Sequence, residues 1–152
     1  MKQNKIIRRR RIFLILIIIW LCVIFIFSSQ SGEESGNTSS RLILGIVNIY
    51  EKITNTIVDK DLAIEKLSYP IRKLAHFTEY FILGLFVYEY VNTFKTKYKL
   101  LKTICFCFTC ACLDEVHQIF SIDRGPSFID SLIDTSGSIV GSSLLKLINK
   151  KR

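Results

Sequence analysis

The stretch that decides the fold is residues 8–27, RRRRIFLILIIIWLCVIFIF. Four arginines precede sixteen consecutive apolar residues, Ile12 to Phe27. As a helix this run spans about 24 Å, and Ile6, Ile7 and the aliphatic stems of the arginines extend it toward a hydrocarbon core that is roughly 30 Å thick. The run is long for a signal peptide, and no A-x-A-like cleavage site follows it. We therefore predict an uncleaved membrane-spanning helix over about residues 12–27.

Three further apolar blocks follow, at about residues 71–91, 101–120 and 128–148. The last block has a polar first half, but each is long enough to cross a bilayer as a helix. We predict one all-α domain over residues 1–152, a polytopic membrane protein built as a four-helix transmembrane bundle. An even number of spans places both termini on the same side of the membrane.

The segment between the first two predicted spans, residues 28–70, has two parts. Residues 28–40, SSQSGEESGNTSS, are rich in Ser and Gly and lack periodicity, which is typical of an exposed linker. Over residues 41–67 apolar residues recur at spacings of three and four, which predicts one or two amphipathic helices on the outer membrane surface or across the bundle mouth. We expect Pro70 to mark the entry to the second span.

The formal net charge of +8 is explained by topology. If the N-terminus is inside, residues 1–11, 92–102 and 146–152 are the inner segments, and they hold fourteen of the twenty-one Lys and Arg residues. This is the positive-inside pattern. We therefore predict cytoplasmic N- and C-termini and membrane lipids as partners, and we expect no nucleic-acid partner.

Ionisable and polar residues occur at one depth in three of the predicted spans, in the half nearer the outside. The group comprises Lys73, His76, Glu79 and Tyr80, then Asp114, Glu115, His117 and Gln118, then Asp130 and Asp134, with Gln30 and Arg124 at the outer ends of the spans. A charge that faces lipid at this depth costs several kcal/mol, so we expect these side chains to face inward and line a polar cavity. Below it, Gly137 and Gly141 permit close contact between helices.

Four stretches of the sequence carry a family resemblance. They are FSSQ at 27–30, RKLAHFTEYFILG at 72–84, DEVHQIFSIDRGPSFID at 114–130 and DTSGSIVG at 134–141. Together they resemble the VanZ-like membrane protein family. The resemblance implies a multi-pass bacterial membrane protein with a link to low-level resistance to teicoplanin-type glycopeptides. By motif it singles out Gln30, Lys73, His76, Tyr80, Asp114, Glu115, Gln118, Arg124 and Asp130, whereas Asp134 stands where the family often has asparagine.

Several functions remain open at this point. The favoured one is binding of a cell-envelope ligand, either a lipid-linked cell-wall precursor or a glycopeptide, with Lys73 and Arg124 holding its phosphate or carboxylate. The alternatives are an enzyme that acts on an envelope lipid, with His76 as base or a divalent ion held by His and carboxylates, and a structural protein whose charges only fix helix register. A proton-coupled carrier is a further alternative. No P-loop or H-E-x-x-H motif occurs, and we expect no metal and no other cofactor.

Overall fold

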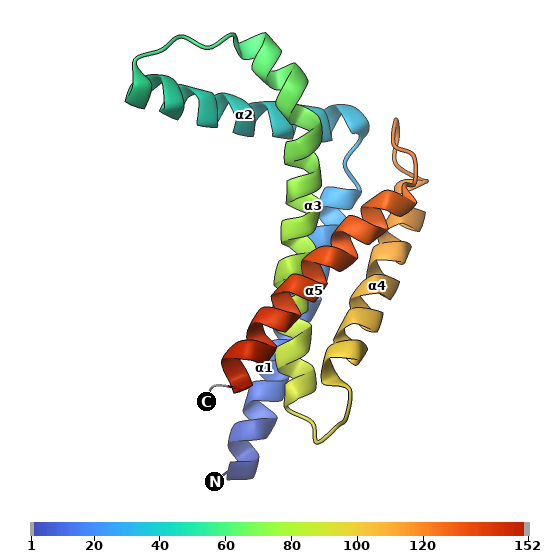
Figure 1. Ribbon diagram of the computed structural model, residues 1–152. Helices are drawn as coiled ribbons and strands as arrows, with labels where there is room; N and C mark the ends of the chain where they lie inside the picture. Colours follow the sequence, from blue (N-terminus) through green and yellow to red (C-terminus); the bar gives the residue numbers. More distant parts are fainter. Residues whose placement is uncertain (1, 151–152) are drawn as a thin grey trace.

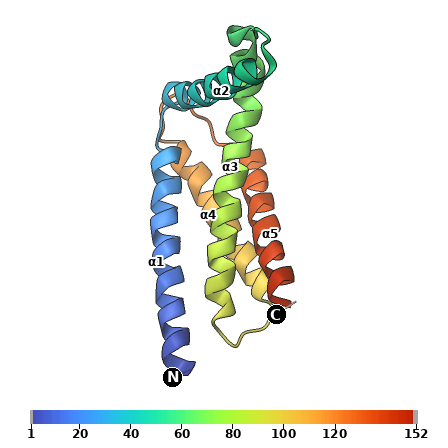
Figure 2. The same cartoon turned by 90° about the vertical axis from the view of Figure 1, so that its left-hand side faces the viewer.

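The computed structural model describes residues 2–150, and it is helical throughout apart from short connections. The helices are α1 (Lys2–Ser28), α2 (Gly32–Thr54), α3 (Lys60–Asn92), α4 (Lys99–Gln118) and α5 (Phe128–Lys150). Figures 1 and 2 show α1, α3, α4 and α5 running along one another as a bundle, with α2 lying across one end. The predicted all-α fold is confirmed, and α4 ends two residues before the predicted end of the third span.

The two ends of the chain lie at the end of the bundle opposite α2 (Figures 1 and 2). Arg9 forms an ion pair with Glu89 of α3 there, and Asn149 Nδ2 of α5 donates a hydrogen bond to Glu89 Oε1 at 3.0 Å. Arg10 Nη2 donates to the carbonyl oxygen of Thr93 at 3.3 Å. Glu89 therefore joins α1, α3 and α5 at the end that holds most of the basic residues.

One helix within residues 2–150 is by itself both long and apolar enough to cross a membrane, over Gln3–Ser28 of α1. It includes the predicted first span. The other bundle helices carry several polar and ionisable residues each, and these lower their hydropathy as whole segments. The helical bundle is thus established, and among the described residues α1 is the helix that meets the length and hydropathy of a membrane span.

The prediction of a linker over residues 28–40 is wrong, because α2 begins at Gly32. A capping box starts the helix: Ser31 Oγ accepts from the Glu34 N–H at 3.1 Å, and Glu34 Oε2 accepts from the Ser31 N–H at 2.9 Å. The Gly32 N–H also donates to the carbonyl oxygen of Ile122 at 3.0 Å, and a Cβ on Gly32 would lie 2.6 Å from the Asp123 oxygen. This contact ties α2 to the loop between α4 and α5.

Pro70 lies inside α3, so the prediction that it marks a helix entry is also wrong. The helix begins ten residues earlier, where Asp59 Oδ1 accepts from the N–H groups of Asp61 and Leu62, both at 3.1 Å. A proline within a helix removes one backbone hydrogen bond, and the freed carbonyl can be hydrated where the helix is exposed, as it is at Pro70. The initial part of α3 is tilted away from the remainder (Figure 1).

Helices α3 and α5 approach each other closely through glycines. A Cβ on Gly137 would lie 2.2 Å from the Phe77 carbonyl oxygen, and one on Gly141 would lie 2.3 Å from that of Phe81. Only hydrogen fits at either position. The predicted close contact at these glycines is confirmed, and it sets the distance between the side chains that meet one or two turns away.

Candidate functional site

The interior of the bundle is unusually polar. Thirteen polar or charged residues are buried within the described chain, against ten hydrophobic ones. Large apolar side chains face outward instead, among them Phe120 at 80 %, Leu113 at 63 % and Ile129 at 63 % exposure. This is the reverse of a water-soluble protein, where exposed apolar patches of this kind are rare.

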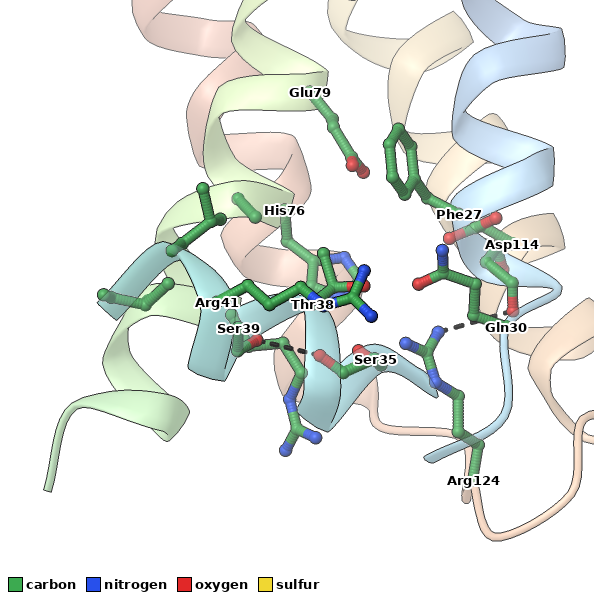
Figure 3. A pocket seen from close by; sticks show the side chains of 15 residues that line it. Phe27, Gln30, Ser35, Thr38, Ser39, Arg41, His76, Glu79, Asp114 and Arg124 are labelled. Carbon is green, nitrogen blue, oxygen red and sulfur yellow. Dashed lines mark hydrogen bonds between the residues drawn. The ribbon is translucent and has the colours of Figure 1, made fainter. Parts of the chain in front are cut away.

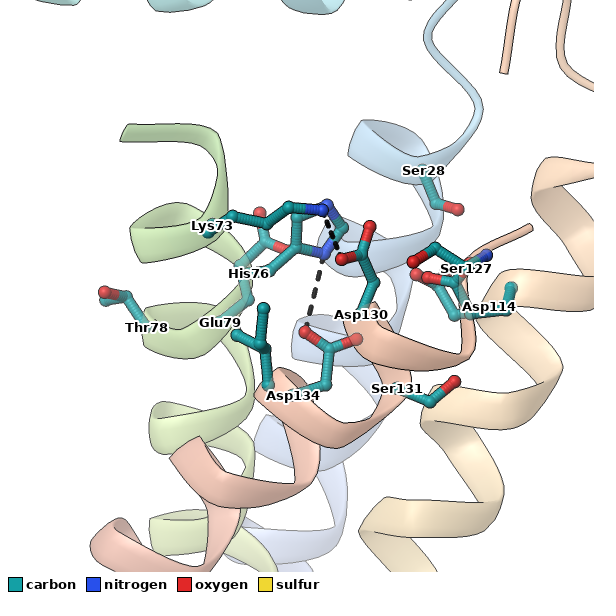
Figure 4. Close-up of polar contacts among 12 residues, drawn as sticks. Ser28, Lys73, His76, Thr78, Glu79, Asp114, Ser127, Asp130, Ser131 and Asp134 are labelled. Carbon is teal, nitrogen blue, oxygen red and sulfur yellow. Dashed lines mark hydrogen bonds and ion pairs between the residues drawn. The ribbon is translucent and has the colours of Figure 1, made fainter. Parts of the chain in front are cut away.

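At the centre of the polar interior, three helices bring one side chain each to the same place: His76 from α3, Asp114 from α4 and Asp134 from α5. One potential ligand atom from each side chain lies within 4.8 Å of the other two. His76 Nδ1 is 3.4 Å from Asp134 Oδ1, and Figure 4 shows the two side chains pointing toward each other. Asp134 is completely buried. These three residues are called the central triad below.

A second contact between α3 and α5 lies beside the central triad. Lys73 Nζ forms an ion pair with Asp130 Oδ1, and both side chains are largely buried (Figure 4). Glu115 Oε2 accepts a 2.6 Å hydrogen bond from the Ser127 N–H at the start of α5. Lys73, Asp130 and Glu115 thus have partners inside the protein, and the cation predicted to bind a ligand at position 73 is already neutralised.

The polar residues of α4 divide into two groups. Gln118 Nε2 donates a hydrogen bond to Asp114 Oδ2 at 3.3 Å and so helps to fix the orientation of this carboxylate within the central triad. His117 lies instead against α1, where its ring stacks on Phe25 at 4.2 Å between centroids and its Nε2 is 3.0 Å from Ser29 Oγ. Asp114 and His117, three residues apart, both line a second cavity beside α1, whereas His117 does not join His76 in the central triad.

Several buried polar atoms around the central triad have no hydrogen-bond partner within the described residues. They are Ser28 Oγ, His76 Nδ1, Tyr80 OH, Glu115 Oε1 and both carboxylate oxygens of Asp134. Each such atom costs free energy on the order of 1–3 kcal/mol unless water, an ion or a ligand satisfies it. These atoms come from α1, α3, α4 and α5, and they make this part of the interior a candidate binding site.

A cavity of about 420 Å³ opens between the central triad and α2. That volume is within the range of sites that hold a small organic group, roughly 300–1,000 Å³. Its wall is formed by Phe27, Ser28, Gln30, Ser35, Thr38, Ser39, Arg41, Leu42, Ile71, Arg72, Ala75, His76, Glu79, Asp114 and Arg124. In Figure 3 the side chains of Gln30, Asp114 and Arg124 lie beside one another on one side of the space. Of the residues predicted to line a polar cavity, five lie in this wall, namely Gln30, His76, Glu79, Asp114 and Arg124, and α2 contributes part of the same wall.

Three arginines, Arg41, Arg72 and Arg124, line this cavity. Within residues 2–150 none of the three lies within ion-pair distance of a carboxylate. Arg124 Nη1 makes only a 3.3 Å hydrogen bond to the Ser28 carbonyl oxygen. Partial burial, followed by the nearby charge of Arg72, lowers the pKa of Arg124, although a guanidinium stays protonated in proteins. A bound anion would relieve this repulsion.

A model of the VanZ/LLP1 family matches residues 13–149. The chain belongs to the VanZ/LLP1 family. The matched segment includes the whole cavity and the central triad. No match was found among curated proteins or solved structures.

For this VanZ/LLP1 protein, sequence reasoning missed the contribution of α2 to the site. Ser35, Thr38, Ser39 and Arg41 all line the cavity but lay within or beside the predicted linker. The S-x-x-E pattern that begins at Ser31 is a helix-start signal and would have revealed the helix. The helix lies across one end of the bundle, which is one of the two positions expected for the amphipathic segment, and it contacts both α3 and the loop between α4 and α5.

Proposed function

We propose that this VanZ/LLP1 protein spans a bacterial cell membrane four times, with both termini in the cytoplasm and α2 at the outer surface. The polar interior and apolar exterior of the bundle support this, because helices in lipid must direct polar groups toward one another. The basic residues at the end that holds both termini support the orientation. The cavity would then open near the outer leaflet.

We further propose that the cavity binds the anionic head group of a lipid-linked cell-envelope precursor and that this binding contributes to glycopeptide resistance or envelope homeostasis. The observation that carries the proposal is the set of three arginines without carboxylate partners, Arg41, Arg72 and Arg124. Guanidinium groups bind phosphate and carboxylate through two parallel hydrogen bonds. Three such groups around one cavity suit a diphosphate better than a single carboxylate.

The apolar part of the cavity wall supports an amphiphilic ligand. Phe27, Leu42, Ile71 and Ala75 lie in the same wall as the arginines. A lipid-linked precursor offers a charged group and a hydrocarbon chain joined directly, which such a wall can accommodate side by side. A glycopeptide carries its carboxylate on a rigid peptide, so we place it second as a ligand.

A catalytic role is the alternative that a specific observation favours. His76 Nδ1 is 3.4 Å from Asp134 Oδ1, as in a general base that a carboxylate orients, and His76 lines the cavity. A purely structural role is supported less well. Of the ion pairs expected for that role, Lys73–Asp130 forms, whereas Arg72 and Arg124 lack carboxylate partners within the described chain.

Binding to nanodisc-reconstituted protein tests the proposal. A polyprenyl diphosphate, the corresponding uncharged polyprenol and teicoplanin are compared by native mass spectrometry and by titration. Losing one charge-assisted contact costs about 1.5–3 kcal/mol, so Arg124→Gln and Arg72→Gln should each weaken diphosphate binding roughly ten- to a hundred-fold. Lys52→Gln, an exposed position of α2 outside the cavity, is the matched control.

Unchanged diphosphate affinity in the Arg72→Gln/Arg124→Gln double variant would refute binding at this site. Tighter binding of teicoplanin than of the diphosphate would identify the glycopeptide as the ligand of the cavity. Conversion of the lipid by wild type but not by His76→Ala would favour the enzyme. In cells, lipid analysis of precursors in a deletion strain complemented with wild type or Arg124→Gln gives an independent test.

A further inference from the structure

The central triad carries more negative charge than the protein itself compensates. Lys73 neutralises Asp130, and Glu115 is held by the backbone of Ser127. Among the described residues, Asp134 then has His76 as its ion-pair partner, and Asp114 has no ion pair. We propose that His76, Asp114 and Asp134 together bind one divalent metal ion of the Zn²⁺ or Mn²⁺ type, which replaces the sequence-based expectation of no metal.

The geometry places three ligands from three helices around one point. Their ligand atoms lie within 4.8 Å of one another. Ligand atoms on one tetrahedral Zn²⁺ are roughly 3.4 Å apart, as follows from bonds of about 2.1 Å. Small side-chain rotations are sufficient to close the site around an ion. Three protein ligands with a fourth position left open is the arrangement of catalytic zinc sites.

An independent observation at Asp134 points to a ligand. Its side chain is 0 % exposed, and neither carboxylate oxygen has a hydrogen-bond partner within the described residues. His76 Nδ1 likewise has no hydrogen-bond partner that meets normal geometry, although it lies 3.4 Å from Asp134 Oδ1. Figure 4 shows the Asp134 carboxylate directed at His76. A buried carboxylate in this condition is costly unless a cation lies beside it.

The surroundings match those of a metal site in two further respects. Gln118 Nε2 donates to Asp114 Oδ2 at 3.3 Å, which fixes one carboxylate in the way that outer partners orient metal ligands. His76 and Asp114 also line the 420 Å³ cavity, so the open coordination position faces it. A phosphate oxygen of a bound ligand can fill that position, and this last step alone rests on the proposed function.

The donor set decides the class of ion. One imidazole nitrogen and two carboxylate oxygens suit Zn²⁺ and Mn²⁺, whereas Mg²⁺ prefers oxygen ligands alone and retains several waters. We therefore expect Zn²⁺ and Mn²⁺ to bind about a hundred-fold more tightly than Mg²⁺, or tighter still. The reason is that Mg²⁺ is poorly matched to a site with an imidazole ligand.

The test uses the full chain in detergent, purified without a histidine tag and stripped with chelator. Zn²⁺ is titrated by calorimetry, elemental analysis gives the stoichiometry, and Co²⁺ absorption in the visible range reports the coordination number. We expect one ion per chain and a four- or five-coordinate Co²⁺ spectrum. His76→Ala and Asp134→Asn should abolish saturable binding, and Gln118→Ala should weaken it about ten- to a hundred-fold. Glu65→Gln, an exposed carboxylate of α3, should bind as wild type does.

Absence of saturable Zn²⁺ or Mn²⁺ binding in wild type would overturn the inference. So would wild-type affinity in both His76→Ala and Asp134→Asn, which would make the ion adventitious. If Asp134→Asn fails to fold, the test uses the Zn²⁺ affinity and the Co²⁺ spectrum of His76→Ala and Gln118→Ala. Wild-type affinity and a wild-type spectrum in both variants would overturn the inference. No lipid is present in any arm, so a failure here leaves the arginine-based binding proposal to its own test.

Discussion

Replacing Gly137 with alanine provides a quantitative test of the packing that holds the site together. The added Cβ would lie 2.2 Å from the Phe77 carbonyl oxygen, whereas ordinary contact begins at 3.4 Å, so α3 and α5 must part locally by about 1.2 Å. Overpacking of this kind costs about 1–3 kcal/mol, and a rigid backbone neighbour favours the upper end. The higher helix propensity of alanine offsets about 1 kcal/mol of this loss in the free energy of unfolding. We expect a net loss near 2 kcal/mol, which is roughly 4–8 °C in melting temperature for a chain of this size.

The assay is thermal unfolding in detergent, with Gly45→Ala as the matched control. Gly45 also lies within a helix, but a Cβ there meets nothing within 4 Å. Its substitution should raise the melting temperature by a few degrees, about 2–4 °C per kcal/mol of added propensity. A Gly137→Ala protein as stable as wild type would show that α3 and α5 are not in the described contact. Because Asp134 lies one turn from Gly137, the same variant should also weaken Zn²⁺ binding.

Further predictions concern orientation, a buried pair and a helix cap. With accessible native thiols blocked, a membrane-impermeant reagent added outside intact cells should label Thr56→Cys but not Lys97→Cys, and the reverse pattern would contradict the proposed orientation. Asp130→Asn leaves Lys73 without its counterion and should lower the free energy of unfolding by an amount near the lower end of about 3–5 kcal/mol, measured by thermal unfolding. Adding Lys73→Met should recover part of the lost stability. An Asp130→Asn protein as stable as wild type would exclude the ion pair. Ser31→Ala removes the N-cap of α2, so it should lower the free energy of unfolding by about 1 kcal/mol and weaken diphosphate binding. Ser31→Asp supplies another capping side chain and should restore both stability and binding.

The depth of polar residues could be predicted from the sequence, but their pairing could not. Helical rise alone places His76, Asp114 and Asp134 at similar depths, because each lies a known number of residues from the end of an apolar block. The choice of partner depends on helix rotation and separation. Lys73 forms an ion pair with Asp130, and the close contact at Gly137 fixes how α5 faces α3. His117 contacts α1 instead, because it lies on the side of α4 that faces Phe25 and Ser29.

The arginine-lined cavity was predictable only in part. Arg124 and the outer ends of the spans were expected at the cavity, whereas Arg41 reaches it because α2 folds back over the bundle. That path includes packing of α2 against α3 and a contact between Gly32 and the loop at Ile122 and Asp123, which lies far along the chain. Hydrophobic periodicity describes the faces of α2 but carries no information about such a distant attachment.

The pairing of α3 with α5 also constrains how the chain is made. Lys73 and Asp130 are 57 residues apart, so synthesis at roughly 5–20 residues per second separates their emergence from the ribosome by about 3–11 s. During that interval Lys73 and His76 have no counterions from α5, so in the proposed four-span topology α3 would carry unpaired polar groups into lipid if it were released alone. Insertion should therefore retain the earlier helices beside the translocation channel until α5 arrives. A chain that stops after α4 should be held there and degraded, however well its first helix enters the membrane.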